Sequence, residues 1–241
     1  MKSRLVSIVV PVYNEEATVG RLLAKVVAAK LPAGFKKEII VVDDGSRDRS
    51  RDMIYDLRIK NRNIKLITHR KNRGKGAALK TGFGKAGGEV IIIQDADLEY
   101  NPSDYEKLIK PIMNGGAQVV YGSRLKKLPF VLFGENKTPL PMHYVANKFL
   151  SLATNLIYGS NLTDMETCYK VFKKRVLKDF EIKADRFDFE AEFTAKVLKA
   201  GYKIVEVPIS TRPRGYDEGK KIGFWDGVIA LWTIIKYRFV D

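Results

Sequence analysis

The sequence LVSIVVPVYNEEATVGRLLAKVV at residues 5–27 contains the first unit of a strand–helix pattern. Its run of apolar, mostly β-branched residues from Leu5 to Val10 ends at Pro11, as is typical of a buried strand. Between Glu15 and Lys30 the apolar residues recur at helical spacing. The stretch therefore predicts a buried strand followed by a helix that packs on the face of a sheet.

The same alternation continues as far as residue 125. Apolar runs predict further strands at residues 38–42, 64–68, 89–94 and from 118 onward, with helical patterns between them. Strands that are apolar throughout and are separated by helices form parallel sheets covered on both faces. The predicted fold class is therefore α/β, with a mostly parallel central sheet and helices on both faces.

The second half of the chain is less regular. The patterns predict helices at 143–158 and 187–200, a strand at 203–207, and a loop from 125 to 141. Residues 223–240 predict an amphipathic C-terminal helix, whose apolar stretch is too short to span a bilayer. Because no repeat or linker interrupts the sequence, all 241 residues are predicted to form a single domain.

The composition excludes several classes of protein. A chain that is 45% hydrophobic with one cysteine, Cys168, is neither disordered nor a disulfide-stapled mini-protein, and a reducing, cytoplasmic compartment is expected. The net charge of +15 attracts polyanions such as nucleic acid, anionic lipid or phosphorylated substrates. The basic clusters around Arg73 and Lys126 lack interleaved aromatic residues, so a basic nucleic-acid-binding protein is only a distant alternative.

Acidic residues follow three of the predicted strands at the point where each strand ends. Asn14-Glu15 follows the first strand, Asp43-Asp44 the second, and Asp95-Ala96-Asp97 the strand at 89–94. Because ligands of such sheets bind beyond the carboxyl ends of the strands, these residues are expected at one ligand-binding edge. A carboxylate there can accept hydrogen bonds from a base or ribose, and Tyr13 could stack on the base. Together the three clusters predict a nucleotide site.

The pair Asp95 and Asp97 has the spacing of a metal site. Two carboxylates two residues apart on a turning backbone can converge on one hard cation, and Mg²⁺ or Mn²⁺ is usually held by one or two carboxylates plus substrate phosphates. Glu99 is a further oxygen ligand in reach. Such a pair on its own is more often a solvated turn, so its meaning depends on the neighbouring clusters.

Five ordered motifs in the first 125 residues resemble glycosyltransferase family 2. They are PVYNE at 11–15, VVDDGS at 41–46, NRGKGAALKTG at 72–82, DADLE at 95–99 and GSR at 122–124. The resemblance implies the GT-A fold, a Rossmann-like nucleotide-binding sheet with an Asp-x-Asp metal motif. It divides the domain into a nucleotide-sugar half, 1–125, and an acceptor half, 126–241.

The second half resembles the dolichyl-phosphate mannose synthase and polyprenyl-phosphate glycosyltransferase branch of that family. The resemblance rests on DMETCYKVFKK at 164–174, RFDFEAEFTAKV at 186–197 and VEVPISTRPRGYDEGKKIG at 205–223. It implies a nucleotide sugar as donor and a polyprenyl phosphate as acceptor.

The resemblance also assigns roles to single positions. The residues implied to hold the base and ribose are Pro11, Tyr13, Glu15, Val42, Asp43 and Asp44. The diphosphate and a Mg²⁺ or Mn²⁺ ion would meet Asp95, Ala96 and Asp97, with Glu99 as a further ligand. Cations implied near the phosphates are Arg124, Arg214, Lys220 and, in the proline-bearing loop, Lys137.

The expected function is inverting, metal-dependent transfer of mannose or glucose from GDP-mannose or UDP-glucose to a polyprenyl (dolichyl) phosphate. The alternative is a glycan, small-molecule or protein hydroxyl as acceptor, which would need a carboxylate base. Glu190, Glu192 and Asp164 could supply that base, with Glu192 taken as the catalytic candidate. A lipid acceptor implies a cytoplasmic protein with peripheral contact at the membrane, which Lys236 and Arg238 in the last helix would suit.

Overall fold

The computed structural model describes residues 4–126, 141–212 and 223–240. The strands are β1 (Arg4–Val12), β2 (Phe35–Asp43), β3 (Ile64–Thr68), β4 (Val90–Ile93), β5 (Val119–Ser123), β6 (Lys170–Lys173) and β7 (Ile204–Pro208). The α-helices are α1 (Val19–Ala28), α2 (Ser50–Lys60), α3 (Lys75–Lys85), α4 (Tyr105–Met113), α5 (Pro141–Tyr158), α6 (Phe189–Lys199) and α7 (Phe224–Phe239), and short 3₁₀ helices lie at Pro102–Asp104 and Lys174–Lys178.

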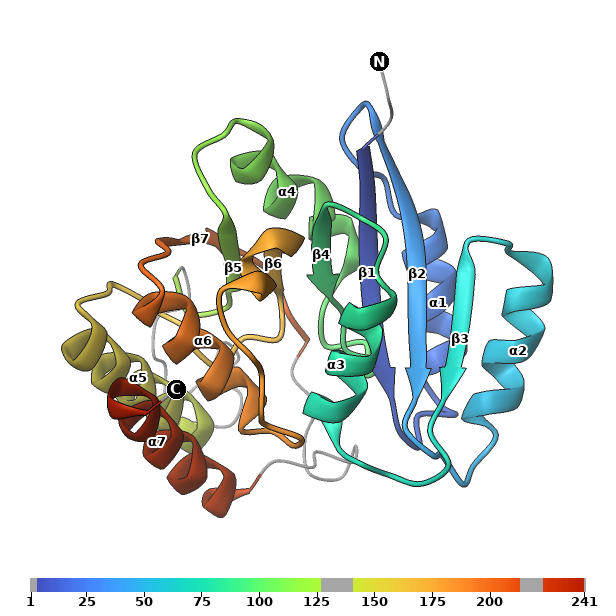
Figure 1. Cartoon of the computed structure of the whole chain (residues 1–241). Helices are drawn as coiled ribbons and strands as arrows, with labels where there is room; N and C mark the ends of the chain where they lie inside the picture. Colours follow the sequence, from blue (N-terminus) through green and yellow to red (C-terminus); the bar gives the residue numbers. More distant parts are fainter. Residues whose placement is uncertain (1–3, 127–140, 213–222, 241) are drawn as a thin grey trace, which may run out of the picture.

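The strands form one sheet in the order β3-β2-β1-β4-β6-β5-β7. All neighbouring pairs are parallel except those of β6, which runs antiparallel to both β4 and β5. Helices cover both faces, with α3 on one face and α1 on the other (Figure 1). The chain passes from β1 to β2 and from β3 back to β4 in opposite directions along the sheet, so right-handed crossovers put α1 and α3 on opposite faces. The predicted α/β class is confirmed.

Strand β6 lies near the centre of the sheet, although the sequence pattern did not predict it. It spans only KVFK, with lysines at both ends, so no apolar run reveals it. The first lysine, Lys170, is fully buried because its ammonium group forms an ion pair with Glu190 on α6. A buried ion pair thus replaces the apolar side chain that would have marked the strand.

The sheet core follows from the apolar runs. Val6, Ile8, Val9 and Val10 of β1 are fully buried on both faces, as a continuous apolar strand requires. Helices α5, α6 and α7 form a second packing unit at one end of the sheet, where Leu150, Met165, Ala191, Ala230 and Ile234 share a smaller core (Figure 1). Within the described ranges, no helix is long and apolar enough to cross a membrane.

Candidate active site

The carboxyl ends of β1 and β2 bring the PVYNE and DDGS loops together. In the parallel register Val12 lies opposite Asp43, so the two loops leave the sheet side by side. The amide of Asn14 donates to Ser46 Oγ at 3.0 Å, and Asn14 Oδ1 accepts from the amide of Arg47 at 2.9 Å. Asn14 has φ +50°, a left-handed conformation that asparagine adopts more readily than most residues. The edge predicted from the sequence is therefore assembled by direct contacts.

The carboxylates of Asp43 and Asp44 are buried and hydrogen-bonded within the protein. Asp43 accepts from the amide of Ser46 at 3.0 Å and from Arg51 Nε at 2.7 Å. Asp44 accepts from the amide of Gly74 at 2.7 Å and lies 2.6 Å from Nδ1 of His69, a residue without any role in the sequence prediction. These two acids therefore shape the loops at the edge, and Asp44 ties β2 to the NRGKG motif.

The other predicted base and ribose residues occupy the same loops. Val42 is fully buried, whereas Pro11 and Tyr13 are partly accessible. Glu15 is almost buried, and its Oε2 accepts from Thr18 Oγ1 at 2.7 Å. Pro11 and Tyr13 are thus the members of this set with surface available to a ligand.

The DADLE loop follows β4 on the same edge. Asp95, Asp97 and Glu99 are partly accessible, and Ala96 is buried. The amide of Glu99 donates to Asp97 Oδ1 at 3.0 Å. Leu98 between them has φ +64°, and a bulky residue held in that region is typical of functional loops.

Lys75 reaches this loop from the start of α3. Its Nζ lies 2.9 Å from Asp95 Oδ1 and 3.0 Å from Glu190 Oε1. Although burial disfavours the ammonium charge, these carboxylates hold the pKa of Lys75 well above its ordinary value. Glu190 also pairs with Lys170, so alternating charges extend from Asp95 to the buried strand β6. Lys75 was not among the site residues predicted from the sequence, where its only signal is its place within NRGKG.

The two glycines beside Lys75 let the backbone before α6 approach α3. A Cβ on Gly74, which has φ +102°, would lie 2.2 Å from the carbonyl oxygen of Asp185. A Cβ on Gly76 would lie 2.4 Å from that of Ala184. The close approach lets the amide of Ala77 donate to Asp185 O at 3.0 Å, which positions Lys75 against Glu190.

The donor set of the DADLE loop fits a hard divalent cation. Mg²⁺ keeps several waters and is commonly held by one or two carboxylates plus substrate phosphates, and Asp95 and Asp97 offer two such carboxylates at the sheet edge. In the described ranges, no three His, Cys, Asp or Glu side chains converge as a preformed metal site. A cation here would therefore be completed by substrate oxygens rather than by protein alone.

Arg124 is held at the end of β5 by a buried carboxylate. Its Nε and Nη2 donate to the two oxygens of Asp164 at 2.8 and 2.7 Å, and Asn147 of α5 donates to Asp164 Oδ1 at 2.6 Å. Burial opposes the charge of Asp164, but Arg124 lowers the pKa of that carboxyl below its ordinary value. The guanidinium carbon lies 5.9 Å from the Tyr100 ring, just past the DADLE loop. The arginine is thus rigid and adjacent to the predicted metal loop.

Glu166 is a second residue that the sequence analysis missed. Its Oε1 is buried and has no hydrogen-bond partner among residues 4–126, 141–212 and 223–240. Burial, reinforced by the nearby Glu190 carboxylate, raises the pKa of Glu166 to about 7. Its only sequence signal is its place in DMET, between Asp164 and the buried Cys168.

Glu192 is placed differently from the role assigned to it. Its carboxylate is fully buried, accepts from the amides of Lys183 and Ala184, and pairs with Lys196 Nζ at 2.7 Å. Burial opposes its charge, yet these partners lower the pKa of Glu192. It therefore anchors the segment before α6 and has no surface open to an acceptor. Lys137, Arg214 and Lys220 lie outside the described residues.

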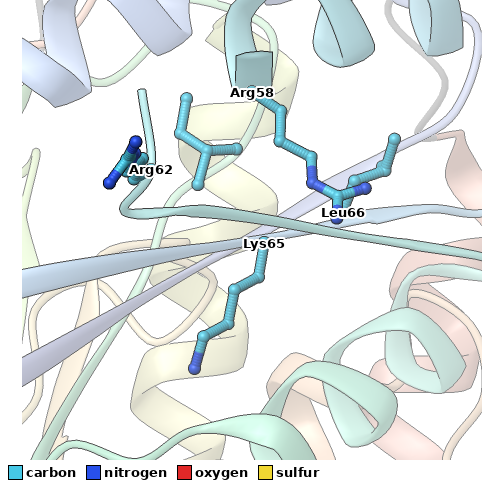
Figure 2. Close-up of a pocket in the computed structure, with 5 residues that line it drawn as sticks. Arg58, Arg62, Lys65 and Leu66 are labelled. Carbon is cyan, nitrogen blue, oxygen red and sulfur yellow. The ribbon is translucent and has the colours of Figure 1, made fainter. Parts of the chain in front are cut away.

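A cavity of about 360 Å³ lies elsewhere, lined by Arg58, Arg62, Ile64, Lys65 and Leu66 (Figure 2). Figure 2 shows Arg58 and Lys65 on opposite sides of β3, and Lys65 is paired with Glu38 at 2.6 Å. This cavity is at the amino end of β3, the edge opposite to the motif loops. It is not part of the candidate site.

Comparison with known proteins identifies the family. The profile described as glycosyl transferase family 2 matches residues 7–180. The UDP-N-acetylglucosamine–dolichyl-phosphate N-acetylglucosaminyltransferase of Methanococcus voltae is 32% identical over 228 residues, 88% of this chain and 87% of that protein. The dolichol-phosphate mannosyltransferase of Pyrococcus furiosus is 29% identical over 97% of this chain and 64% of that protein.

A solved structure supports the same fold. Glucosyl-3-phosphoglycerate synthase from Mycobacterium tuberculosis, in complex with Mn²⁺, UDP-glucose and phosphoglyceric acid, matches with a TM-score of 0.69 at 18% identity. The match covers 99% of this chain and 81% of that chain. Since the profile runs from β1 past β6 and its motif loops meet at one sheet edge, this chain is a glycosyltransferase of the GT-A fold and belongs to glycosyl transferase family 2.

Proposed function

We propose that this glycosyltransferase transfers mannose or glucose from GDP-mannose or UDP-glucose to a polyprenyl phosphate such as dolichyl phosphate, with inversion at the sugar C1. The observation that carries the proposal is the rigid Arg124–Asp164 pair beside the DADLE loop. The names of the M. voltae and P. furiosus relatives, which match most of this chain including its second half, support the acceptor class.

The donor would lie across the edge formed by the β1, β2 and β4 loops. Tyr13 and Pro11 have surface for the base, while Asp95 and Asp97 would hold Mg²⁺ or Mn²⁺ against the diphosphate. A bound divalent ion would neutralise the charge that develops on the leaving nucleoside diphosphate. Lys75 keeps the Asp95 carboxylate oriented at this place, because it contacts both Asp95 and Glu190.

A phosphate acceptor needs orientation more than activation. With a second pKa near ~6, a phosphate monoester is already largely an anionic nucleophile at neutral pH. Arg124 would position that anion, because its guanidinium is preorganised by Asp164 and remains partly accessible. Arg214, Lys220 and Lys137 are proposed as further cations for the phosphates. The whole chain is proposed to act as one domain, cytoplasmic and peripheral at the membrane.

The second candidate function is transfer to a hydroxyl group of a glycan, small molecule or protein. Glu166 favours it, because a carboxyl whose Oε1 is buried without a hydrogen-bond partner among the described residues, and whose pKa is raised to about 7, has the properties of a general base. In that reaction Glu166 would accept the hydroxyl proton as the acceptor oxygen attacks C1. Asp164 and Glu190 are less suited, since ion pairs occupy both.

Transfer assays with paired acceptors test the proposal. Purified protein with Mn²⁺ and each sugar nucleotide should glycosylate a short-chain polyprenyl phosphate, whereas the unphosphorylated polyprenol should be inert. Arg124→Lys should lose most activity, and the matched control Lys126→Gln should keep it. If the enzyme instead glycosylated the polyprenol, and Glu166→Gln abolished that reaction, the phosphate acceptor would be contradicted and the second candidate established.

A further inference from the structure

Helices α5 and α7 expose apolar side chains where surface helices normally expose polar ones. On α5 the outward stripe is Met142, Val145, Phe149, Leu152 and Leu156, spaced by three and four residues along one side. Leu156 is 77% exposed to solvent. An ordinary surface helix places such a stripe toward the core.

Three of the four buried residues of α5 are polar, and the fourth is Leu150. Asn147, Ser151 and Thr154 point inward and are hydrogen-bonded, Asn147 to Asp164 and Thr154 to the Leu150 carbonyl. The usual arrangement of a surface helix is therefore inverted. Such an inversion indicates that the outer side of α5 meets an apolar environment.

Helix α7 carries a stripe with the same spacing. It consists of Trp225, Val228, Trp232, Ile235 and Phe239, with Trp225 73% and Trp232 63% exposed. The two helices pack side by side at one end of the molecule and share Leu150, Ala230 and Ile234 as a core (Figure 1). We call the two stripes together the α5–α7 face. Its ten exposed apolar side chains lie on two neighbouring helices, whereas an ordinary soluble surface exposes such residues singly.

The charged residues on helices α5 and α7 are mostly basic. Helix α5 contains no acidic residue, and the single acid of α7, Asp226, accepts a hydrogen bond from the amide of Gly223 at the helix start. Lys148, Lys236 and Arg238 lie on the two helices. A second copy of this chain would bring the same positive charge to the contact, whereas anionic phospholipid would complement it.

We propose that the α5–α7 face is a membrane-docking surface that lies in the headgroup region of an anionic phospholipid bilayer. Exposed tryptophans, long apolar side chains and flanking lysine and arginine are the features of helices that lie in the plane of that interface. This inference rests on the proposed function, because a polyprenyl phosphate acceptor resides in a bilayer and the enzyme would have to reach it there.

The location of the face agrees with that purpose. Asn147, on the inner side of α5, holds the Asp164 carboxylate that orients Arg124. One helix, about 10 Å in diameter, therefore separates the bilayer contact from the arginine proposed to bind the acceptor phosphate. A bilayer on the outer side of α5 would thus bring lipid phosphates close to the transfer site.

Tryptophan fluorescence tests the surface directly, because Trp225 and Trp232 are the two tryptophans of the chain and both lie on this face. The full chain would be mixed with vesicles of phosphatidylcholine and phosphatidylglycerol that contain no polyprenyl phosphate. We expect flotation with the vesicles, a blue shift of tryptophan emission, and weaker binding in pure phosphatidylcholine or high salt. Vesicle binding without a blue shift, or no binding, would overturn the proposal.

Matched substitutions locate the contact. Trp232→Ser and Leu156→Ser should each weaken vesicle binding by roughly tenfold. The control Ile59→Ser replaces a residue that is 67% exposed on the distant helix α2 and should bind as the wild type does. A blue shift that depends on protein concentration without vesicles would show self-association through this face and overturn the lipid assignment.

The docking surface and the proposed transfer reaction can be tested independently. Transfer to a water-soluble short-chain polyprenyl phosphate does not require a bilayer, so Trp232→Ser should keep that activity while losing transfer to vesicle-embedded acceptor. Vesicle binding without any transfer would contradict the proposed function alone, and transfer without vesicle binding would contradict the docking surface alone.

Discussion

The guanidinium of Arg124 and the carboxylate of Asp164 form a two-pronged contact, with Nε–Oδ2 and Nη2–Oδ1 distances of 2.8 and 2.7 Å. The carboxylate is fully buried and is also bound by Asn147. A buried pair of this geometry restricts the arginine to one orientation. It also joins the end of β5 to the loop before β6 and to α5.

Replacement of Asp164 by asparagine should therefore affect both stability and transfer. The change leaves the Arg124 charge without its partner, and the loss of one member of a buried pair typically destabilises by about 3–5 kcal/mol. Urea unfolding would measure the free energy, with the exposed Asp52→Asn on α2 as control. Equal unfolding free energies for Asp164→Asn and wild type would show that the pair does not stabilise the fold.

Asp97→Ala should remove activity while preserving the fold. Asp97 lies in the partly accessible DADLE loop, where its carboxylate is proposed to bind the cation, so transfer should fall by roughly a hundredfold or more. Assays over a range of Mn²⁺ concentrations, with circular dichroism to confirm folding, would test this. The control is Glu106→Ala, which replaces an exposed residue of α4, and a wild-type rate in Asp97→Ala would refute the metal assignment.

Gly74→Ala, at the residue before α3, should destabilise the protein, whereas Gly84→Ala near the end of α3 should not. The new Cβ at Gly74 would meet the Asp185 carbonyl at 2.2 Å with φ +102°, and strain of this kind typically costs about 1–3 kcal/mol or more. A Cβ at Gly84 meets no atom within 4 Å and should stabilise α3 by about 0.5–1 kcal/mol. Thermal unfolding of both variants would check the opposite signs, and similar shifts would contradict the close approach.

The stability of the protein should depend on the ionisation of Glu166. Burial and Glu190 raise its pKa from 4.5 to about 7, while Lys170 and Arg124 oppose the rise and Asp164 adds to it. Because the folded pKa is higher than the unfolded one, the contribution of this group is fully present below pH 4.5 and is lost as the pH rises through about 7.

Glu166→Gln should remove that loss, since the amide stays neutral. Relative to wild type it should gain about 1–3 kcal/mol of unfolding free energy between pH 5 and pH 8. Urea titrations at the two pH values measure the difference, with the exposed Glu106→Gln as reference. A constant difference between Glu166→Gln and wild type at both pH values would disprove the raised pKa.

Much of the fold follows from local patterns. The apolar runs that became β1 and β2 predicted buried parallel strands, and the acids after them marked the ligand edge, because a parallel sheet brings all carboxyl ends to one side. The helix predicted at 223–240 is α7, shorter by a residue at each end. The loops proposed to form the nucleotide site were located in the same way.

The ion pairs of the site could not be predicted from the sequence. Glu190 was expected only as a candidate base, and it pairs with Lys75 and Lys170 because β6 inserts antiparallel between β4 and β5 and brings three separate elements together. Glu192 was predicted to be a base from its position on α6 alone. That position could not reveal that its carboxylate accepts hydrogen bonds from the amides of Lys183 and Ala184.

Local periodicity in this chain thus specifies which residues form strands and helices, and the family motifs specify the chemistry of the sheet edge. The tertiary structure alone decides which cation each carboxylate pairs with, because partners such as Lys75 and Glu190 lie far apart in the sequence and meet only in the fold. It also decides the outward direction of the apolar stripes on α5 and α7. The spacing of apolar residues shows that one side of each helix is apolar. Only the packing of α5 and α7 against α6 determines which side meets the core.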